Sequence, residues 1–231
     1  MADHEAETSV AESLRIADEF KNEGNDHFRA RRWDEALVAY RAGLGRVPKR
    51  REPQLQPNAD VDDDSLVDED RETPKDQTPI PLTPEETECA KARAVLNANI
   101  GACFVKLDDH KQAVEACSQA LLDDPSYIKA LQRRASSNEK INSWSSLTSA
   151  QEDYTTLLKI LPPSTPQTKE IERFQYLLKP RLEAAQKEET AEMLGKLKGL
   201  GNSILGNFGL STDNFKFEPN GQGGYSMNFA K

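Results

Sequence analysis

The segment Gly24–Pro48, GNDHFRARRWDEALVAYRAGLGRVP, contains a pattern that recurs twice further along the chain. Four of its residues are Gly24, Ala36, Tyr40 and Pro48, and 77 residues later the same positions hold Gly101, Ala113, Cys117 and Pro125. A third copy follows with Ala135, Ala150, Tyr154 and Pro162. Recurrence of this kind indicates an array of similar structural units that stack on one another.

Each copy predicts two helices joined by a turn. Apolar or small residues occupy every fourth position of the first helix in copy one: Ile16, Phe20, Gly24 and Phe28. The pattern breaks at Ala30–Arg32, and a second helix is predicted from Trp33 to Arg46. Glycine inside a helix costs about 1 kcal/mol relative to alanine. Gly24 therefore predicts that a neighbouring helix approaches closely at that point.

The repeats are placed at residues 17–50, 94–127 and 128–164. The third copy has three extra residues between its helices, around 142–147, which predict a longer turn. Three such hairpins are the smallest number expected to bury a continuous core.

Two acidic segments flank the first repeat. Residues 1–16 are predicted to be a disordered acidic N-terminus, and residues 50–82 a disordered acidic insertion between repeats one and two. Within the insertion, Asp60–Asp70 carries seven acids and no base. This stretch has two interpretations: a solubilising spacer, which we favour, or an internal competitor for a basic site elsewhere in the chain.

Thr83-Pro-Glu-Glu86 has the residues of a capping box, so a helix should begin there and continue to about Lys106. Residues 165–198 predict a long capping helix that covers the last repeat. The tail, 199–231, is predicted to hold a β-hairpin whose turn is Pro219–Gly224.

The composition excludes several function classes. A formal charge of −9 argues against broad attraction to nucleic acid or to anionic membranes. No segment predicts membrane insertion or export, so a cytoplasmic protein is expected. The three cysteines and three histidines lack metal-ligand spacing, and no catalytic motif occurs, so we expect no metal, no cofactor and no enzymatic activity.

The repeat spacing resembles the tetratricopeptide repeat (TPR), a helix–turn–helix of 34 residues. The tail, LGKLKGLGN followed by FGLSTDNF and YSMNF, is similar to the family of tetratricopeptide repeat protein 1. This resemblance implies an all-α fold: a right-handed superhelix of three TPR helical hairpins with a C-terminal capping helix and a small tail hairpin. In that fold the first helix of each repeat lines the concave face.

The resemblance also implies a binding site. TPR domains that bind the acidic C-terminal peptides of the chaperones Hsp70 and Hsp90, of the type Glu-Glu-Val-Asp, use five residues as a carboxylate clamp. The residues at those positions here are Lys21, Asn25, Asn99, Lys129 and Arg133. A peptide ending in Asp presents two carboxylates, which lysine, arginine and asparagine side chains can bind. We therefore expect a co-chaperone or adaptor.

The sequence leaves two alternatives open. The chain could be a TPR domain that binds another ligand. It could also be a signalling scaffold that recruits a GTPase or another partner through the convex face or the tail. A scaffold of this kind would keep its activity when the charges of Lys129 and Arg133 are removed.

Overall fold

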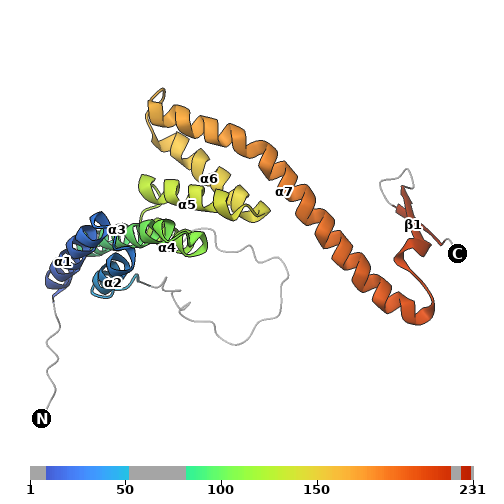
Figure 1. The fold of residues 1–231 in the computed structure, drawn as a ribbon, viewed down its shortest axis with the longest axis horizontal. Coiled ribbons are helices and arrows are strands. Elements are labelled where there is room, and N and C mark those ends of the chain that lie inside the picture. Colours follow the sequence, from blue (N-terminus) through green and yellow to red (C-terminus); the bar gives the residue numbers. More distant parts are fainter. Residues whose placement is uncertain (1–8, 52–81, 220–224, 230–231) are drawn as a thin grey trace, which may run out of the picture. The chain divides into compact units, whose positions relative to one another are not determined.

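This computed structural model describes residues 9–51, 82–219 and 225–229. Its helices are α1 Val10–Arg29, α2 Trp33–Leu44, α3 Pro84–Lys106, α4 His110–Asp123, α5 Ile128–Ile141, α6 Trp144–Ile160 and α7 Pro166–Leu205 (Figure 1). The all-α fold of helical hairpins is confirmed. The chain divides into two compact units, residues 1–137 and 138–231, with the boundary inside α5.

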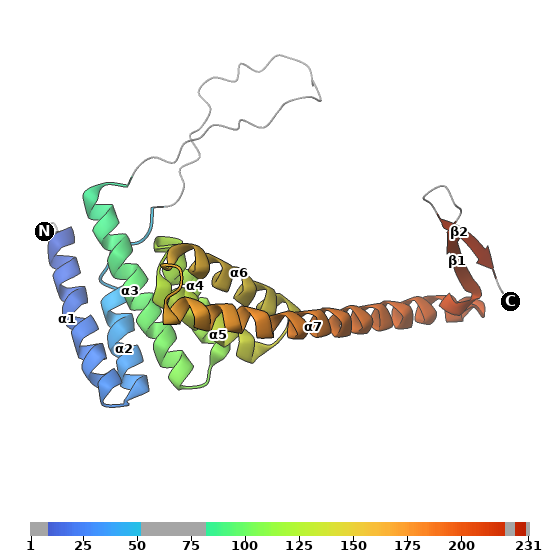
Figure 2. The ribbon, with the colours of Figure 1, turned by 90° about the horizontal axis from the view of Figure 1, so that it is seen from above.

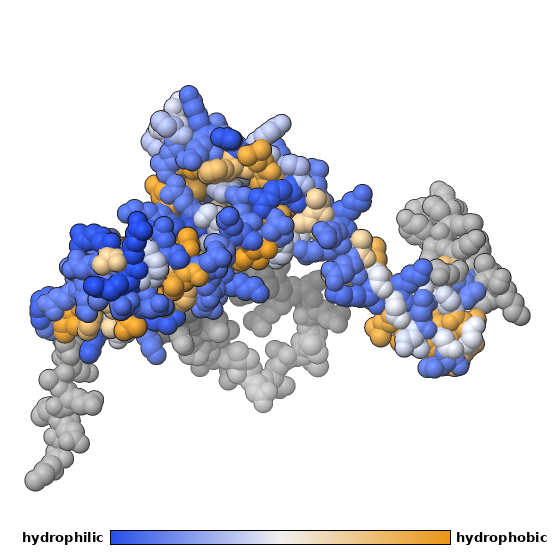
Figure 3. Space-filling view, viewed as in Figure 1, coloured by the Kyte–Doolittle hydropathy of each residue, from blue (hydrophilic) through white to orange (hydrophobic). Residues whose placement is uncertain are grey.

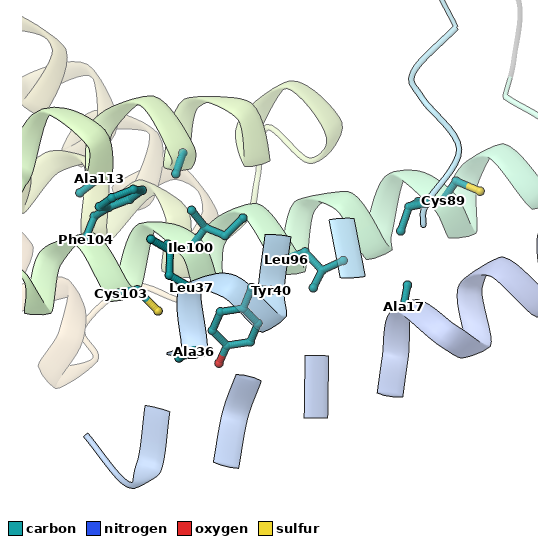
Figure 4. Packing of buried hydrophobic residues seen from close by; sticks show 12 residues of the cluster. Ala17, Ala36, Leu37, Tyr40, Cys89, Leu96, Ile100, Cys103, Phe104 and Ala113 are labelled. Carbon is teal, nitrogen blue, oxygen red and sulfur yellow. The ribbon is translucent and has the colours of Figure 1, made fainter. Parts of the chain in front are cut away.

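In the first unit, α1, α2 and α3 lie side by side in both ribbon views (Figures 1 and 2). Their core holds Leu37 and Tyr40 from α2 with Leu96, Ile100 and Phe104 from α3 (Figure 4). Glycine is required where the helices cross. A Cβ on Gly24 would lie 2.6 Å from ring carbons of Tyr40, which confirms the predicted close approach.

The start of α3 confirms the predicted capping box. The Thr83 hydroxyl accepts a hydrogen bond from Glu86 N at 3.2 Å, and the Glu86 carboxylate accepts one from Thr83 N at 2.8 Å. Pro84 occupies the first turn, where its missing N–H leaves no helical hydrogen bond unmade. The helix then runs to Lys106, as predicted.

The predicted long turn in repeat three is wrong. Only Asn142 and Ser143 separate α5 from α6, and the extra residues belong to α6, which has 17 residues against 12 in α2 and 14 in α4. The Ser143 side chain accepts a hydrogen bond from Ser146 N and caps the helix early. The left-handed residue that ends the first helix is retained in all three repeats, at Arg31, Asp108 and Asn142.

The first helix starts earlier than the repeat pattern predicts. α1 begins at Val10, so the prediction of disorder over residues 1–16 is wrong for residues 10–16, and residues 1–8 lie outside the described chain. Ser9 caps the helix, and Val10 and Leu14 pack against the core. Residues 52–81 of the predicted insertion likewise lie outside the described chain.

In the second unit, α7 packs against α6 and continues through Pro180 to Leu205, seven residues past the predicted end (Figure 2). Gly209, with φ 70°, supplies the left-handed residue that ends this stretch, and Leu210 N donates to Leu205 O. Two 3₁₀ turns follow, η1 Gly206–Phe208 and η2 Thr212–Asn214.

The tail forms the predicted antiparallel hairpin from β1 Phe215–Pro219 and β2 Tyr225–Phe229, with Phe215 opposite Phe229. Five of the six residues of its predicted turn, 220–224, lie outside the described chain. No helix in the described ranges is both long and apolar enough to cross a membrane.

Candidate functional site

The five predicted clamp residues all belong to the first unit and lie on the first helices of the three repeats. Lys21 and Asn25 are one turn apart on α1, Asn99 is on α3, and Lys129 and Arg133 are one turn apart on α5. Lys129 is exposed and the other four are partly buried. These helices therefore present three cations and two amides.

Asn25 is held in one orientation by the second helix of its own repeat. The hydroxyl of Tyr40 donates to Asn25 Oδ1 at 2.9 Å. Burial raises the pKa of Tyr40 to about 12, so its hydroxyl keeps its proton at neutral pH and stays a donor. Because the oxygen of Asn25 is occupied, its amide nitrogen, which has no acceptor among the described residues, is the group left to bind an anion.

Arg133 connects α5 to the backbone of α3 beside Asn99. Its Nη1 donates to the carbonyl oxygen of Ala98 at 2.8 Å, which fixes one side of the guanidinium. Neither Nη2 nor Nε of Arg133 has an acceptor in the described part of the chain. The neighbouring Arg134 is directed differently, since it donates to Ser118 Oγ on α4.

The charge of Arg133 acts on groups from three other segments, which places it near them. Burial raises the pKa of Tyr40, Cys103 and Tyr127, and the positive charge of Arg133 partly offsets each rise. Tyr40 is the residue that holds Asn25. Asn25 and Arg133 therefore both lie near the buried Tyr40. Arg133 also contacts the backbone of α3 at Ala98, the residue that precedes Asn99.

Lys21 and Lys129 are less closely joined to this group. Lys21 forms an ion pair with Asp18 on its own helix. Lys129 has no hydrogen-bond or ion-pair partner among the described residues. No contact within the described ranges links either lysine directly to Asn25, Asn99 or Arg133. Both are long enough to turn toward a bound anion from one helical turn away.

A cavity of about 240 Å³ lies beside Lys21, between α1 and α3. Its wall is apolar at Leu14, Ala17, Val95 and Leu96, and Asp18 and Lys21 border it. The sequence alone does not predict this cavity, because its width depends on how two helices pack.

The role of the Tyr40 hydroxyl is not predicted from the sequence either. In repeat three the Tyr154 hydroxyl likewise donates to a first-helix side chain, Glu139 Oε1. Glu139 lies three residues beyond the position equivalent to Asn25, so the repeat spacing does not predict the partner of either tyrosine.

Comparisons with known proteins establish the fold. No family model matches the chain. FK506-binding protein 5 of Rhizopus delemar is 32% identical over 126 residues, which are 54% of this chain and 25% of that protein, so the chain spans about a quarter of this relative's length.

Two solved structures are similar over most of the chain. The C-terminal TPR-containing domain of a Plasmodium falciparum FK506-binding protein is 20% identical, with a TM-score of 0.54, and the match covers 78% of this chain and 97% of that one. The Hsp90 co-chaperone Cns1 from Saccharomyces cerevisiae is 18% identical, with a TM-score of 0.50 over 89% of this chain and 51% of its own. The chain therefore has the fold of a TPR domain.

Proposed function

We propose that the chain is a co-chaperone or adaptor that binds the acidic C-terminal peptide of Hsp70 or Hsp90 through Lys21, Asn25, Asn99, Lys129 and Arg133. The bound group is the terminal aspartate with its two carboxylates. Lysines supply compact charges, Arg133 supplies a planar pair of donors, and the two asparagines supply neutral N–H groups. The site performs binding and no chemical step.

The arrangement around Tyr40 is the observation that carries this proposal. Asn25 and Arg133 are each anchored by one hydrogen bond to a neighbouring helix, at 2.9 Å and 2.8 Å. Each anchor leaves N–H donors without a protein acceptor among the described residues. Donors fixed in this way lose little side-chain freedom when an anion binds, so less of the binding free energy is spent on ordering them.

The similarity to yeast Cns1 is one of fold, and the description as an Hsp90 co-chaperone belongs to that protein. We extend this role to the present chain because the five residues stand at the clamp positions. The same proposal places the chain in the cytoplasm, where these chaperones act, and among the relatives of tetratricopeptide repeat protein 1.

The proposal is tested by titration calorimetry with a peptide ending in Glu-Glu-Val-Asp. Lys129→Ala should weaken binding by about 1.5–3 kcal/mol, the contribution of a hydrogen bond to a charged group. Lys129 is exposed and has no partner among the described residues, so its removal should not disturb the fold. Arg133→Ala should weaken binding at least as much.

Lys111→Ala is the matched control, because Lys111 is an exposed lysine on α4, a second helix of a repeat. It removes the same charge and should leave affinity within about 0.5 kcal/mol of the wild type. Equal losses for Lys111→Ala and Lys129→Ala would refute the clamp and indicate non-specific attraction. If Lys129→Ala and Arg133→Ala both kept the peptide affinity of the wild type, the result would favour a scaffold that binds through another surface.

A further inference from the structure

The C-terminal half of α7 exposes a row of large apolar side chains. Met193, Leu194, Leu197, Leu200, Ile204 and the following Phe208 are each between 58% and 76% exposed. We call these six residues the exposed stripe. Orange patches lie among blue toward the C-terminal end of α7 in the hydropathy view (Figure 3). Single exposed apolar residues are normal, but a row of six on neighbouring turns indicates a binding surface.

Helical geometry places these residues on one face. At 3.6 residues per turn they fall within an arc of about 120°, the width of the apolar face of an amphipathic helix. The opposite face carries small or uncharged residues: Gly195, Gly199, Asn202, Ser203 and Gly206. The tail contacts the helix at Gly201 and Asn202, where Thr212 N donates to Asn202 Oδ1 at 2.7 Å. Gly201 lies within the arc of the exposed stripe, but the six side chains of the stripe stay largely exposed.

The charge of this segment is opposite to that of the whole chain. The formal charge of the protein is −9, yet between Met193 and Thr212 the only charged residues are Lys196 and Lys198. At 100° per residue these lysines lie on opposite borders of the exposed stripe, beside Leu200 and Leu194 respectively. Lys196 also pairs with Glu192 at 2.6 Å, on an exposed surface where such a pair is weak.

We propose that the exposed stripe is a membrane-surface site, which lies in the interface of an anionic bilayer with Lys196 and Lys198 at the level of the lipid phosphates. An apolar face bordered by lysines and backed by uncharged residues is the pattern of an interfacial helix. The segment lies on the bilayer and does not cross it, in agreement with the absence of a spanning helix in the described ranges.

Pairing with a second copy of the chain explains the pattern less well. The spacing Met193, Leu197, Leu200, Ile204 fits a coiled-coil seam, but it extends over only about two heptads, and stable coiled coils need three or four. A Cβ on Gly195 or Gly199 would have nothing within 4 Å. These glycines therefore weaken the helix without serving a close helix contact in the structure. A bilayer requires no matching seam.

The test is flotation of the full-length protein with two kinds of vesicle. One is pure phosphatidylcholine, and in the other roughly a third of the lipid is phosphatidylserine. We expect binding to the phosphatidylserine vesicles, weaker binding to phosphatidylcholine, and a loss of the difference when salt is raised from about 0.1 M to about 0.5 M. Leu197→Gln with Ile204→Gln should lower the bound fraction more than tenfold, because two apolar side chains that the bilayer would bury are replaced by polar ones.

Val38→Gln with Leu122→Gln is the matched control. These residues are 69% and 62% exposed on α2 and α4, so the variant removes the same amount of exposed apolar surface elsewhere. It should bind vesicles like the wild type, whereas Lys196→Gln with Lys198→Gln should bind both vesicle types equally. Circular dichroism checks that each variant is folded.

Three results would overturn the proposal. The wild type could fail to float with either vesicle, or Leu197→Gln with Ile204→Gln and its control Val38→Gln with Leu122→Gln could lose binding equally. Sedimentation could also show a dimer that Leu197→Gln with Ile204→Gln dissociates, and the exposed stripe would then be a contact between two copies. None of these results bears on peptide binding, because no residue of the proposed clamp is changed.

Discussion

At the residue scale, one buried hydroxyl links the packing of repeat one to the proposed binding chemistry. Tyr40 packs its ring over Gly24 and donates its hydroxyl proton to Asn25. The same side chain therefore fills the helix crossing and orients an amide at the candidate site.

Tyr40→Phe should separate these two roles. The ring still fills the crossing, but Asn25 Oδ1 loses its donor, so the free energy of unfolding should fall by about 1 kcal/mol. Peptide affinity should fall as well, because the amide of Asn25 can then rotate. Tyr154→Phe removes the hydrogen bond from the corresponding tyrosine to Glu139 in the second unit and should leave peptide affinity unchanged. Urea unfolding and calorimetry measure the two effects, and equal peptide affinities for Tyr40→Phe and the wild type would contradict this role of Asn25.

Two glycine substitutions should act in opposite directions. Gly24→Ala places a methyl group 2.6 Å from ring carbons of Tyr40, so repacking should cost about 1–3 kcal/mol. Gly195→Ala meets nothing within 4 Å on an exposed helix and should stabilise α7 locally by about 1 kcal/mol. Hydrogen exchange of the amides in α1 and in α7 measures each change. If the amides of α1 exchanged more slowly in Gly24→Ala than in the wild type, the close approach would not be required.

The sequence predicts which residues occupy the first-helix positions, because a 34-residue period fixes the face on which each residue lies. It does not predict the anchors. The hydrogen bond from Arg133 to the Ala98 carbonyl joins residues 35 apart, and its existence depends on the distance between two packed helices. Local periodicity carries no information about that distance.

At the scale of elements, a buried carboxylate joins the segment after α2 to α3 and α4. The side chain of Asp123 is 1% exposed and accepts hydrogen bonds from Arg50 at 2.7 Å and from Arg93 at 2.8 Å. Burial alone would raise the pKa of Asp123, but the two arginines outweigh burial and hold the pKa below its ordinary value of 3.8. This ion-pair cluster fixes the end of repeat one against repeat two.

A lowered pKa makes the contribution of Asp123 depend on pH in one direction. Its stabilising effect is fully present above the unfolded-state pKa, near pH 4, and is lost as the pH falls through the lower folded-state value. Asp123→Asn should therefore cost about 3 kcal/mol at pH 7, because two arginines lose their anion. It should also flatten the fall in stability between about pH 4 and pH 2.

Urea unfolding at a series of pH values measures this effect. Glu88→Gln is the control, since the Glu88–Lys91 pair is exposed on both sides and should contribute less than about 0.5 kcal/mol. An Asp123→Asn variant whose stability falls with acid as steeply as that of the wild type would assign the acid sensitivity to other carboxylates.

Element boundaries were predictable where a cap is encoded locally and not elsewhere. Thr83 and Glu86 specify the start of α3 through their own hydrogen bonds. The early start of α6 depends on Ser143, whose capping role competes with a longer turn that the repeat count alone favours. The extension of α1 back to Val10 depends on packing of Val10 and Leu14 against the core, which an acidic local composition conceals.

At the scale of the whole molecule, charge is distributed unevenly along the chain. Asp60–Asp70 holds seven acids, while the proposed clamp contributes three cations and the exposed stripe is bordered by two lysines. An acidic protein can therefore bind acidic partners at separate basic places, and each such interaction should weaken with salt.

Deletion of residues 60–70 should leave peptide affinity unchanged, because we expect this segment to be a solubilising spacer. An internal acidic segment has no main-chain carboxylate, so it lacks one of the two groups that the clamp is proposed to bind. Calorimetry on the deleted and full-length chains tests this. A clear gain in affinity on deletion would show that the segment competes for the site.

The central claim is that the first helices form a receptor for a chain terminus. Its most direct test is calorimetric titration of the full-length protein with one Glu-Glu-Val-Asp peptide in two forms, the free acid and the C-terminal amide. We predict that the free acid binds and that the amide loses about 2 kcal/mol or more, because one carboxylate and its charged hydrogen bonds are removed. Equal binding of the two forms, or no binding of either, would contradict the claim.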